Sequence, residues 1–224
     1  MSSSEKHVAD AKQKHHAKTP GKTTKRVRLS PEVRRQMILE AALVEFSAMG
    51  FSAATTANIA KRAGTTQSNL YVHFSSKDEI FETLLKQVLV PADGVWKPMS
   101  PGQSLHDVIN AFIDDAYSRI TPQSVAVIRL MIAESHRIPG LIQRWYEEAV
   151  IPVRNEQQRR IAEYAAAGQM QDSPLSHDFG LLTAPLLYVA VMKMVFPGDI
   201  AENECLKVKE AHRKVLHLLL EPPR

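Results

Sequence analysis

The sequence contains a single cysteine, no long apolar run and no secretory leader. Cys205 has no partner for a disulfide within the chain, which fits a reducing compartment. The N-terminus lacks the apolar segment of a signal peptide. The most apolar stretch, residues 179–196, is interrupted by Pro185 and Lys193, and a membrane span needs about 20 apolar residues. We therefore expect a cytoplasmic protein without a membrane segment, in which this apolar stretch is a helix buried between subunits.

Common catalytic patterns are also missing. The chain has no G-x-S-x-G, P-loop, H-E-x-x-H or paired-cysteine motif. Glu134, Ser135 and His136 are consecutive, and consecutive residues on a helix do not face one another, so they make a poor catalytic triad. His106, His136 and His177 could meet at a metal ion only through the fold, which the sequence does not show. We therefore predict that the chain is not an enzyme and has no cofactor or metal site.

Positive charge is concentrated at the N-terminus. The 224 residues carry a net charge of +4, yet residues 1–30 alone hold eight basic and two acidic residues. Residues 1–28 are rich in Lys, His, Thr and Ser and have too few apolar groups for a core, so we predict a disordered arm. This arm either contacts DNA phosphates or a minor groove, or is a solvated leader. His15 and His16 fit the composition of the arm better than a metal site.

Two short helices around a tight turn are predicted within residues 55–77, after a longer helix that begins at Ser30-Pro31 and ends at Gly50. Thr56 caps the first short helix, and Gly64 ends it because glycine adopts a left-handed conformation without strain. Either Thr65 or Thr66 caps the second. Leu70 and Phe74 form its inner face at a spacing of four residues.

The outer face of the second short helix carries hydrogen-bonding groups but no carboxylate and no arginine. These residues are Thr66, Gln67, Ser68, Asn69, Tyr71 and His73. An Asn or Gln amide offers a donor and an acceptor together, which matches the edge of adenine, and a Ser hydroxyl reads either kind of edge. The pattern is typical of a helix whose N-terminal half enters a major groove.

Residues 38–84 resemble the DNA-binding domain of the TetR family of repressors, most specifically in the L-Y-x-H-F-x-S-K element at residues 70–77. The resemblance implies a helix-turn-helix at about 55–74 within a DNA-binding domain of residues 29–92. It implies that Tyr71, His73 and Lys77 contact phosphates, and the cap residue Thr56 can do so too. Position 57 is alanine where some family members have a long polar side chain, so base reading falls on residues 66–69. Without an arginine here, we expect a site read mainly through A·T pairs and DNA shape.

The remainder, residues 93–224, is predicted to form a larger helical domain, which makes the fold all-α. The breaker cluster at residues 91–101 marks the boundary. Helices are expected from Ser104, from Thr121 to His136, from Pro139 to Ala167 with a kink at Pro152, from Ser173, and from Cys205 to Leu220.

The family resemblance also implies a homodimer and a small-molecule effector. The last two helices, at about 175–196 and 205–220, would join two subunits. The two DNA-reading helices of the dimer would then lie about 35 Å apart and bind a palindromic operator in double-stranded DNA. The effector would bind within residues 93–224. The candidate pocket residues are Trp96, Phe112, Tyr117, Arg129, Met131, His136, Trp145, Tyr146, Phe179 and Met192. For any single aromatic or methionine among them, a position in an ordinary core is the favoured interpretation.

Arg129 is more informative than the other pocket candidates, because a charge within an apolar run needs a partner. That partner is Glu134, Asp114, Asp115 or an anionic ligand. Taken together, these features favour a ligand-responsive transcriptional repressor. Alternatives are a helical protein that binds another protein, a similar regulator without a ligand response, and an activator.

Overall fold

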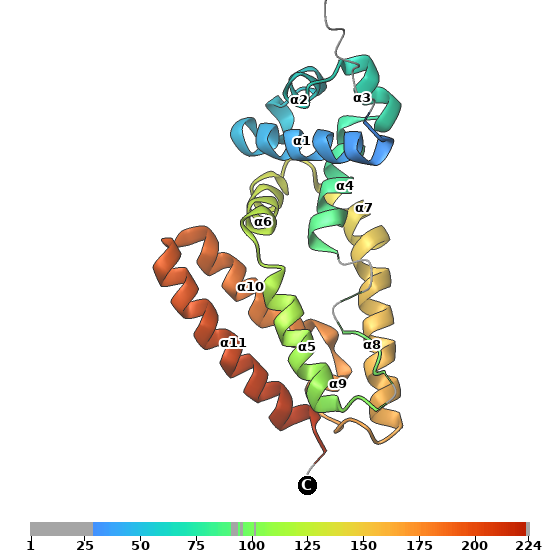
Figure 1. Cartoon of the computed structure of the whole chain (residues 1–224), viewed down its shortest axis with the longest axis vertical. Helices are drawn as coiled ribbons and strands as arrows, with labels where there is room; N and C mark the ends of the chain where they lie inside the picture. The colour runs from blue at the N-terminus through green and yellow to red at the C-terminus, as the bar shows by residue number, and fades with distance from the viewer. Residues whose placement is uncertain (1–28, 91–93, 95, 101, 223–224) are drawn as a thin grey trace, which may run out of the picture.

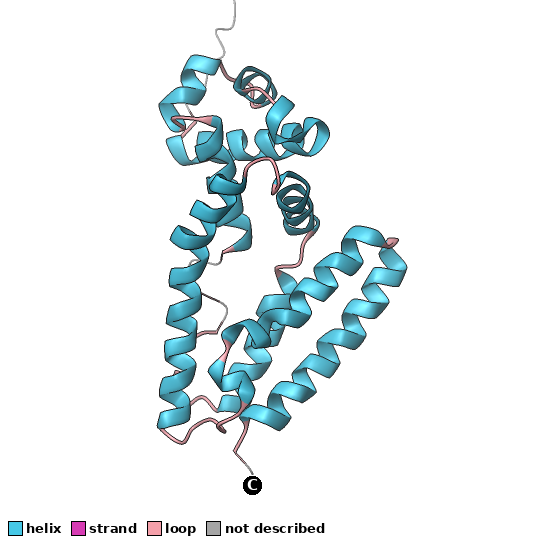
Figure 2. Ribbon diagram, turned by 180° about the vertical axis from the view of Figure 1, so that it is seen from behind, coloured by secondary structure: helices cyan, strands magenta, loops and turns pink. Residues whose placement is uncertain are grey.

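The computed structural model describes residues 29–90, 94, 96–100 and 102–222, and these residues form helices and connecting segments without a strand (Figures 1 and 2). The all-α prediction is therefore confirmed. The predicted N-terminal arm, residues 1–28, lies outside the described residues, as does part of the breaker cluster at 91–101.

Four helices form the N-terminal part of the structure, which we call the head: α1 (Pro31–Ala53), α2 (Thr56–Arg62), α3 (Gln67–His73) and α4 (Lys77–Leu89). In Figure 1, α2 and α3 lie on one side of α1, and α4 leads away from it toward the rest of the chain. The predicted helix-turn-helix is thus present as two seven-residue helices supported by α1.

The first helix begins where the sequence indicates, but at Gly50 it bends instead of ending and continues to Ala53. The side chain of Ser30 accepts a hydrogen bond from the backbone of Val33. Gly50 has a positive φ of 76° and interrupts the helical geometry, after which the chain continues for one more short turn. That turn buries Phe51 against Phe46, with ring centroids 5.4 Å apart. The helix therefore changes direction at the glycine, because only a residue without a Cβ adopts this conformation without strain.

The C-terminal part consists of a further series of helical segments, several of which differ from the predicted bounds. These are α5 (Leu105–Ser118), α6 (Pro122–Glu134), α7 (Pro139–Trp145), the π-helical turn η1 (Tyr146–Val150), α8 (Ile151–Ala166), α9 (Pro174–His177), α10 (Phe179–Val195) and α11 (Gly198–Leu220).

The predicted break at Pro152 is present. The helix that begins at Pro139 passes through the π-helical turn η1 immediately before Pro152, which lies in the first turn of α8. Proline has no N–H to donate to the preceding turn, so the hydrogen-bond ladder changes register there.

The last two predicted helices had wrong starting points. The segment from Ser173 forms only the short α9, and Asp178 then caps α10 by accepting a hydrogen bond from the backbone of Gly180 at 2.7 Å. The final helix starts at Gly198 rather than Cys205. Of its first seven residues only Ile200 and Ala201 are apolar, so the apolar spacing used to find helices gave little signal there.

Two apolar clusters hold the described residues together. The first fills the head and includes Val127 and Leu130 of α6 and Leu141 of α7. The second surrounds Trp96 and is built from α5, α8, α10 and α11. The apolar core of the head therefore extends into α6 and α7, which follow the predicted boundary near residue 92. α6 packs on both α1 and α10, as expected for a helix that is apolar nearly all round.

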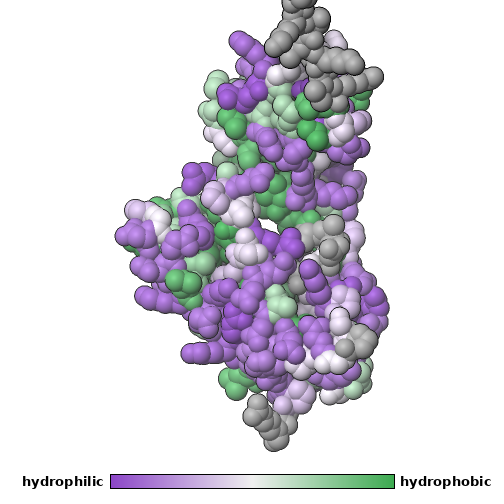
Figure 3. Space-filling model, viewed as in Figure 1, coloured by the Kyte–Doolittle hydropathy of each residue, from purple (hydrophilic) through white to green (hydrophobic). Residues whose placement is uncertain are grey.

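The last two long helices, α10 and α11, lie side by side as an antiparallel pair at one edge of the molecule (Figures 1 and 2). Neither they nor any other described helix combines the length and apolar character needed to cross a bilayer. The face shown in Figure 3 is mostly hydrophilic over the lower helices, with hydrophobic residues gathered below the head.

Candidate DNA-binding face and effector cavity

The turn between α2 and α3 is fixed by side-chain caps and by one glycine. Thr55, not Thr56 as predicted, caps α2, and its hydroxyl accepts a hydrogen bond from the backbone of Asn58 at 3.2 Å. Thr66 caps α3 in the same way, which resolves the choice between Thr65 and Thr66. Gly64 has a φ of 62° between them. Thr55 and Thr56 are equally suitable caps by residue type, so the prediction from the sequence was one residue too late.

The inner and outer faces of α3 separate as predicted. Leu70 and Phe74 are buried, whereas Gln67 and Ser68 are exposed and Asn69 is partly buried. Val72 is 77% exposed, which makes it the most exposed large apolar residue of the head. It lies on the same helix as the polar residues and was missing from the predicted site. An exposed valine on an outward face is the signal that could have identified it, because apolar side chains contact the thymine methyl group.

Thr56 is buried and orients two of the predicted DNA-contacting side chains. Its Oγ1 accepts a hydrogen bond from Gln67 Nε2 at 2.8 Å and lies 3.2 Å from the Tyr71 hydroxyl. The hydroxyl therefore makes internal hydrogen bonds, and its contact with a phosphate stays a prediction. These hydrogen bonds join the first turn of α2 to the outer face of α3.

Asn69 is held by a similar local bond. Its Nδ2 donates to Thr65 Oγ1 at 2.7 Å, so the amide is anchored to the turn that precedes α3. The neighbouring Ser68 makes no side-chain hydrogen bond to the described part of the chain and is exposed. The first turn of α3 thus presents one free hydroxyl between two amides whose orientation is already restricted.

The basic groups near α3 mostly brace the head. Lys77 Nζ donates to the carbonyls of Phe51, Ser52 and Ala54 at 2.7–3.2 Å, where α1 ends. A cation at this end of a helix is favoured by the helix dipole. The Lys77 ammonium therefore has an internal role at the end of α1, and its predicted contact with a phosphate stays a prediction. These hydrogen bonds fix the start of α4 against the end of α1.

His73 is also tied to α1. Arg35 donates a hydrogen bond to the His73 carbonyl, and its guanidinium lies 3.9 Å from the ring centroid of Phe74. Arg34 donates to the carbonyl of Ala63 at 3.2 Å. These contacts fix both ends of the α2–α3 unit on α1. The His73 side chain is only partly buried and stays at the edge of the exposed face.

A cavity of about 480 Å³ lies between the C-terminal end of α4 and the helices α5, α6, α8 and α10. Four of the ten predicted pocket residues are in its wall: Met131, Trp145, Tyr146 and Phe179. Beside the predicted Trp145 and Tyr146, polar groups come from residues that were not predicted, among them Arg119, Ser124, Arg154 and Thr183. An apolar wall with a few polar groups suits an organic ligand.

The other six predicted pocket residues lie elsewhere. Trp96 and Phe112 are core residues with ring centroids 5.2 Å apart, and Tyr117 is buried with its hydroxyl 3.2 Å from His212 Nδ1. The remaining three lie outside the cavity wall, with His136 exposed just after α6 and Met192 on α10. Aromatic and methionine residues fill cores and cavities alike, so residue type alone could not separate the two.

Arg129 pairs with none of the three acidic residues that we predicted for it. Its Nη2 donates to the backbone carbonyl of Met194 at 2.9 Å, near the end of α10. The predicted acidic partners instead pair with other basic residues: Glu134 with Arg137, Asp114 with Lys209 and Arg213, and Asp115 with Arg119. The arginine is exposed, so a single carbonyl is enough to accept its hydrogen bond.

Comparisons with known proteins agree with this geometry. Residues 38–84 match "Bacterial regulatory proteins, tetR family", and residues 103–175 match the "AefR-like transcriptional repressor, C-terminal domain". The HTH-type transcriptional regulator TtgW of Pseudomonas putida is 33% identical over 109 residues, which span 79% of its length. The chain belongs to the TetR family of transcriptional regulators. Its fold and its α2–α3 unit are those expected for that family.

Other relatives of this TetR-family chain match over a shorter part of their length. The HTH-type transcriptional regulator SrpR of Pseudomonas putida is 34% identical over 112 residues, which cover 50% of this chain and 51% of SrpR. The crystal structure of a TetR-family regulator from Mesorhizobium loti covers 87% of the chain with a TM-score of 0.61 at 16% identity, which is a likeness of fold. The chain thus spans about half the length of curated relatives such as SrpR.

Proposed function

We propose that this TetR-family chain is a cytoplasmic homodimeric repressor that binds a palindromic DNA operator through α3 and releases it when a small molecule binds the cavity. The first turn of α3 carries the proposal. It holds Gln67, Ser68 and Asn69 at the surface of a rigid scaffold, with no acidic side chain on the helix. Phosphate repulsion is therefore absent, and amide and hydroxyl groups are available for base edges.

Base reading by α3 requires Gln67 to exchange partners. In the free protein its Nε2 donates to Thr56 Oγ1, whereas a two-point contact with adenine needs both the amide nitrogen and the amide oxygen. Tyr71 can then donate its hydroxyl to a phosphate while Thr56 keeps the ring in place. Val72 supplies an apolar contact for a thymine methyl group. This set of contacts favours sites rich in A·T pairs.

Dimerisation is supported by the exposed apolar residues of α10 and α11. Val195, Leu206 and Leu218 are 61–75% exposed, and large apolar patches on a soluble chain mark interfaces. Further exposed apolar residues on these two helices are Leu181, Leu187, Tyr188, Val191, Ile200 and Val215. A second copy of this pair would cover them and would set the distance between two heads.

The effector response is supported by the position of α4. Its last residues, Val88 and Leu89, line the cavity, and its first residue, Lys77, is bonded to the end of α1 in the head. In its middle, Glu82 accepts a hydrogen bond from Arg144 of α7 at 2.6 Å. A ligand that moves the cavity end of α4 therefore changes where the head lies, and a ligand that prefers one head spacing shifts the affinity for DNA.

Selection of bound genomic DNA tests the proposed function. The full-length protein is mixed with fragments of the genome that encodes it, and bound fragments are sequenced and then measured one at a time at fixed salt. We expect a shared inverted repeat, bound by two chains, with half-sites about one helical turn or a multiple of it apart. Two results would contradict the proposal: recovered fragments that share no sequence, or an affinity that changes with the salt concentration but not with the DNA sequence.

A further inference from the structure

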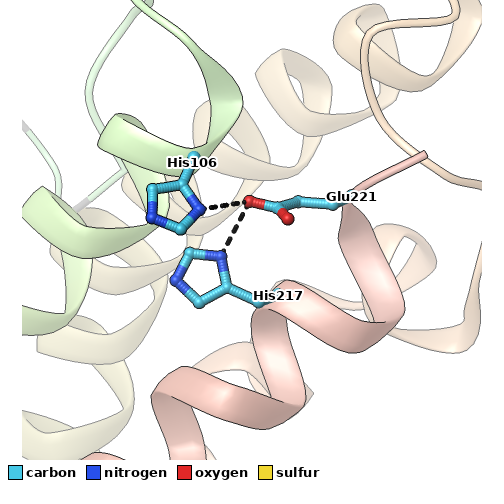
Figure 4. A group of neighbouring side chains, drawn as sticks. All are labelled: His106, His217 and Glu221. Atoms are coloured by element: carbon cyan, nitrogen blue, oxygen red, sulfur yellow. Dashed lines mark hydrogen bonds and ion pairs between the residues drawn. The ribbon is translucent and has the colours of Figure 1, made fainter. Parts of the chain in front are cut away.

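Two histidines and a glutamate meet at the end of the molecule away from the head, where α5 begins and α11 ends (Figure 4). Glu221 Oε1 lies 2.8 Å from His106 Nδ1 and 2.8 Å from His217 Nδ1. The two imidazole rings are stacked, with centroids 4.3 Å apart, so both Nδ1 atoms face the same carboxylate oxygen. The cluster belongs neither to the DNA-binding face nor to the cavity.

The second nitrogen of His217 is also committed. Its Nε2 lies 3.3 Å from Asn110 Oδ1, and the same oxygen accepts a hydrogen bond from Arg213 Nη1 at 2.7 Å. Because a guanidinium only donates, the oxygen of the Asn110 amide must face both groups. In the neutral imidazole, His217 Nε2 therefore carries the proton, and Nδ1 points a lone pair toward the glutamate.

This arrangement leaves a place for a cation. The neutral His217 tautomer that suits Asn110 puts a lone pair of Nδ1 against a carboxylate oxygen, and a positive charge between the two atoms removes that repulsion. A metal-binding histidine typically donates its other ring N–H to an oxygen, as His217 does here. We propose that His106, His217 and Glu221 bind a divalent transition-metal ion of the zinc type.

The ligand set selects the kind of ion. Two imidazole nitrogens and one carboxylate suit Zn²⁺ and its neighbours, whereas Mg²⁺ and Ca²⁺ prefer oxygen ligands alone. Bonds of about 2.0–2.1 Å to a tetrahedral ion place its ligand atoms about 3.3 Å apart. The present spacing of 2.8 Å must open slightly, and His106 can move because its side chain is 59% exposed. Solvent supplies the fourth ligand on that exposed side.

The ion would fasten together two distant parts of the chain. His106 lies in the first turn of α5, and Glu221 lies 115 residues later, immediately after α11. Metal bound to the folded state alone raises its stability by mass action. The site would therefore stabilise the position of α11 against α5, and α11 is one of the two helices that we propose for dimerisation.

Zinc titration of the full-length chain tests the site, with a control for the other histidines. His7, His15 and His16 precede the described residues, so a parent variant with all three changed to Gln removes any binding there. The EDTA-treated parent is titrated calorimetrically with Zn²⁺ and, separately, with Mg²⁺. We expect one Zn²⁺ per chain, no heat from Mg²⁺, and a rise in Tm of roughly 5–10 °C with excess Zn²⁺.

Substitutions in the same parent then locate the ion. His217→Ala and Glu221→Gln each remove a ligand and should weaken Zn²⁺ binding by more than about 10-fold, and Asn110→Ala by about 10- to 100-fold through the orientation of His217. His177→Ala is the matched control, because His177 pairs with Asp172 at 2.7 Å without a third ligand. It should leave the Zn²⁺ affinity unchanged. Melting without metal shows whether each variant is folded. Absence of Zn²⁺ binding by the parent, or equal affinity in the parent and in folded His217→Ala, would overturn the proposal.

Discussion

The carboxylate of Glu134 lies directly against Gly50, with its Oε1 2.7 Å from the point where a Cβ on residue 50 would lie. Gly50 is the bend of α1 in the head, and Glu134 is the last residue of α6, which lines the cavity through Ser124, Ile128 and Met131. The glutamate is 3% exposed and pairs with Arg137 at 3.2 Å. α6 therefore joins the cavity to the head, in parallel with α4.

Replacing Gly50 should lower the stability of the protein beyond the cost of its positive φ alone. Gly50→Ala places a methyl group against the buried Glu134, which adds a packing cost of about 1–3 kcal/mol to the strain of the backbone. Gly50→Ala in a Glu134→Ala background is the control, because it keeps the φ of 76° and the ψ of 161° at residue 50 and removes the carboxylate. The free energy of unfolding from urea titration measures the loss in each background. Equal losses in the two backgrounds would show that the contact with Glu134 has no effect on stability.

Adding a charge to the exposed apolar face of α11 should separate the dimer. Leu206→Glu places a carboxylate at a leucine that is 61% exposed, so the monomer should fold while the subunit contact is lost. Val44→Glu is the control, since Val44 is 47% exposed on α1 in the head. Sedimentation velocity should show a monomer for Leu206→Glu and a dimer for Val44→Glu. A dimer in both cases would rule out α11 as the centre of the interface.

Filling the cavity should block ligand binding. Thr183→Trp places an indole in the cavity wall, and the exposed Ala162→Trp on α8 is a control that adds the same indole outside it. The probe is the fluorescent dye 8-anilinonaphthalene-1-sulfonate, whose emission rises in apolar cavities. We expect weaker dye binding for Thr183→Trp and unchanged dye binding for Ala162→Trp, because only the first indole occupies space in the cavity. Equal dye binding by the two variants would place the dye site elsewhere.

The buried His212 should make the free energy of unfolding depend on pH. Burial lowers the pKa of His212 to about 4, and its Nδ1 faces the hydroxyl of Tyr117. Between its unfolded pKa of about 6.5 and about 4, the unfolded chain binds a proton that the folded chain does not. Stability should therefore fall as the pH drops through this range, by up to about 1.4 kcal/mol for each pH unit.

Two histidine variants isolate this effect. His212→Gln should lose part of the decrease in unfolding free energy between about pH 7 and pH 5, whereas the exposed His177→Gln should retain it. Urea unfolding at a series of pH values supplies the measurement. If the pH dependence of His212→Gln equals that of the wild type, His212 is not the group that titrates.

Local features of the head could be predicted from the sequence, whereas the cavity could be predicted only in part. The spacing of Leu70 and Phe74, the glycine at 64 and the proline at 152 each determine structure within a few residues. The choice between Thr55 and Thr56 as a cap depends on the residue at which the backbone becomes helical, which residue type does not show. Hydrogen bonds such as that from Gln67 to Thr56 span 11 residues and follow from packing.

The missed cavity residues show the same limit over longer distances. Trp145 and Phe179 line the cavity while Trp96 and Phe112 fill the core, although all four are large aromatic residues in helical or turn segments. Arg129 was expected to need a charged partner, but its position near the end of α10 offers a backbone carbonyl instead. The cluster of His106, His217 and Glu221 brings together segments that are more than 100 residues apart. Apart from His217 and Glu221, which are four residues apart, none of these pairings has a signal in residue spacing.

Operator affinity of the α3 variants tests the central claim most directly. Gln67→Ala/Asn69→Ala is compared with Gln36→Ala, which removes an amide from the exposed face of α1, by fluorescence anisotropy on the selected operator and on unrelated DNA at the same salt. We predict that the double variant loses about 1–3 kcal/mol for each base contact on the operator and nothing on unrelated DNA, while Gln36→Ala behaves as the wild type. If the folded double variant binds the operator as tightly as the wild type, α3 does not read the DNA sequence.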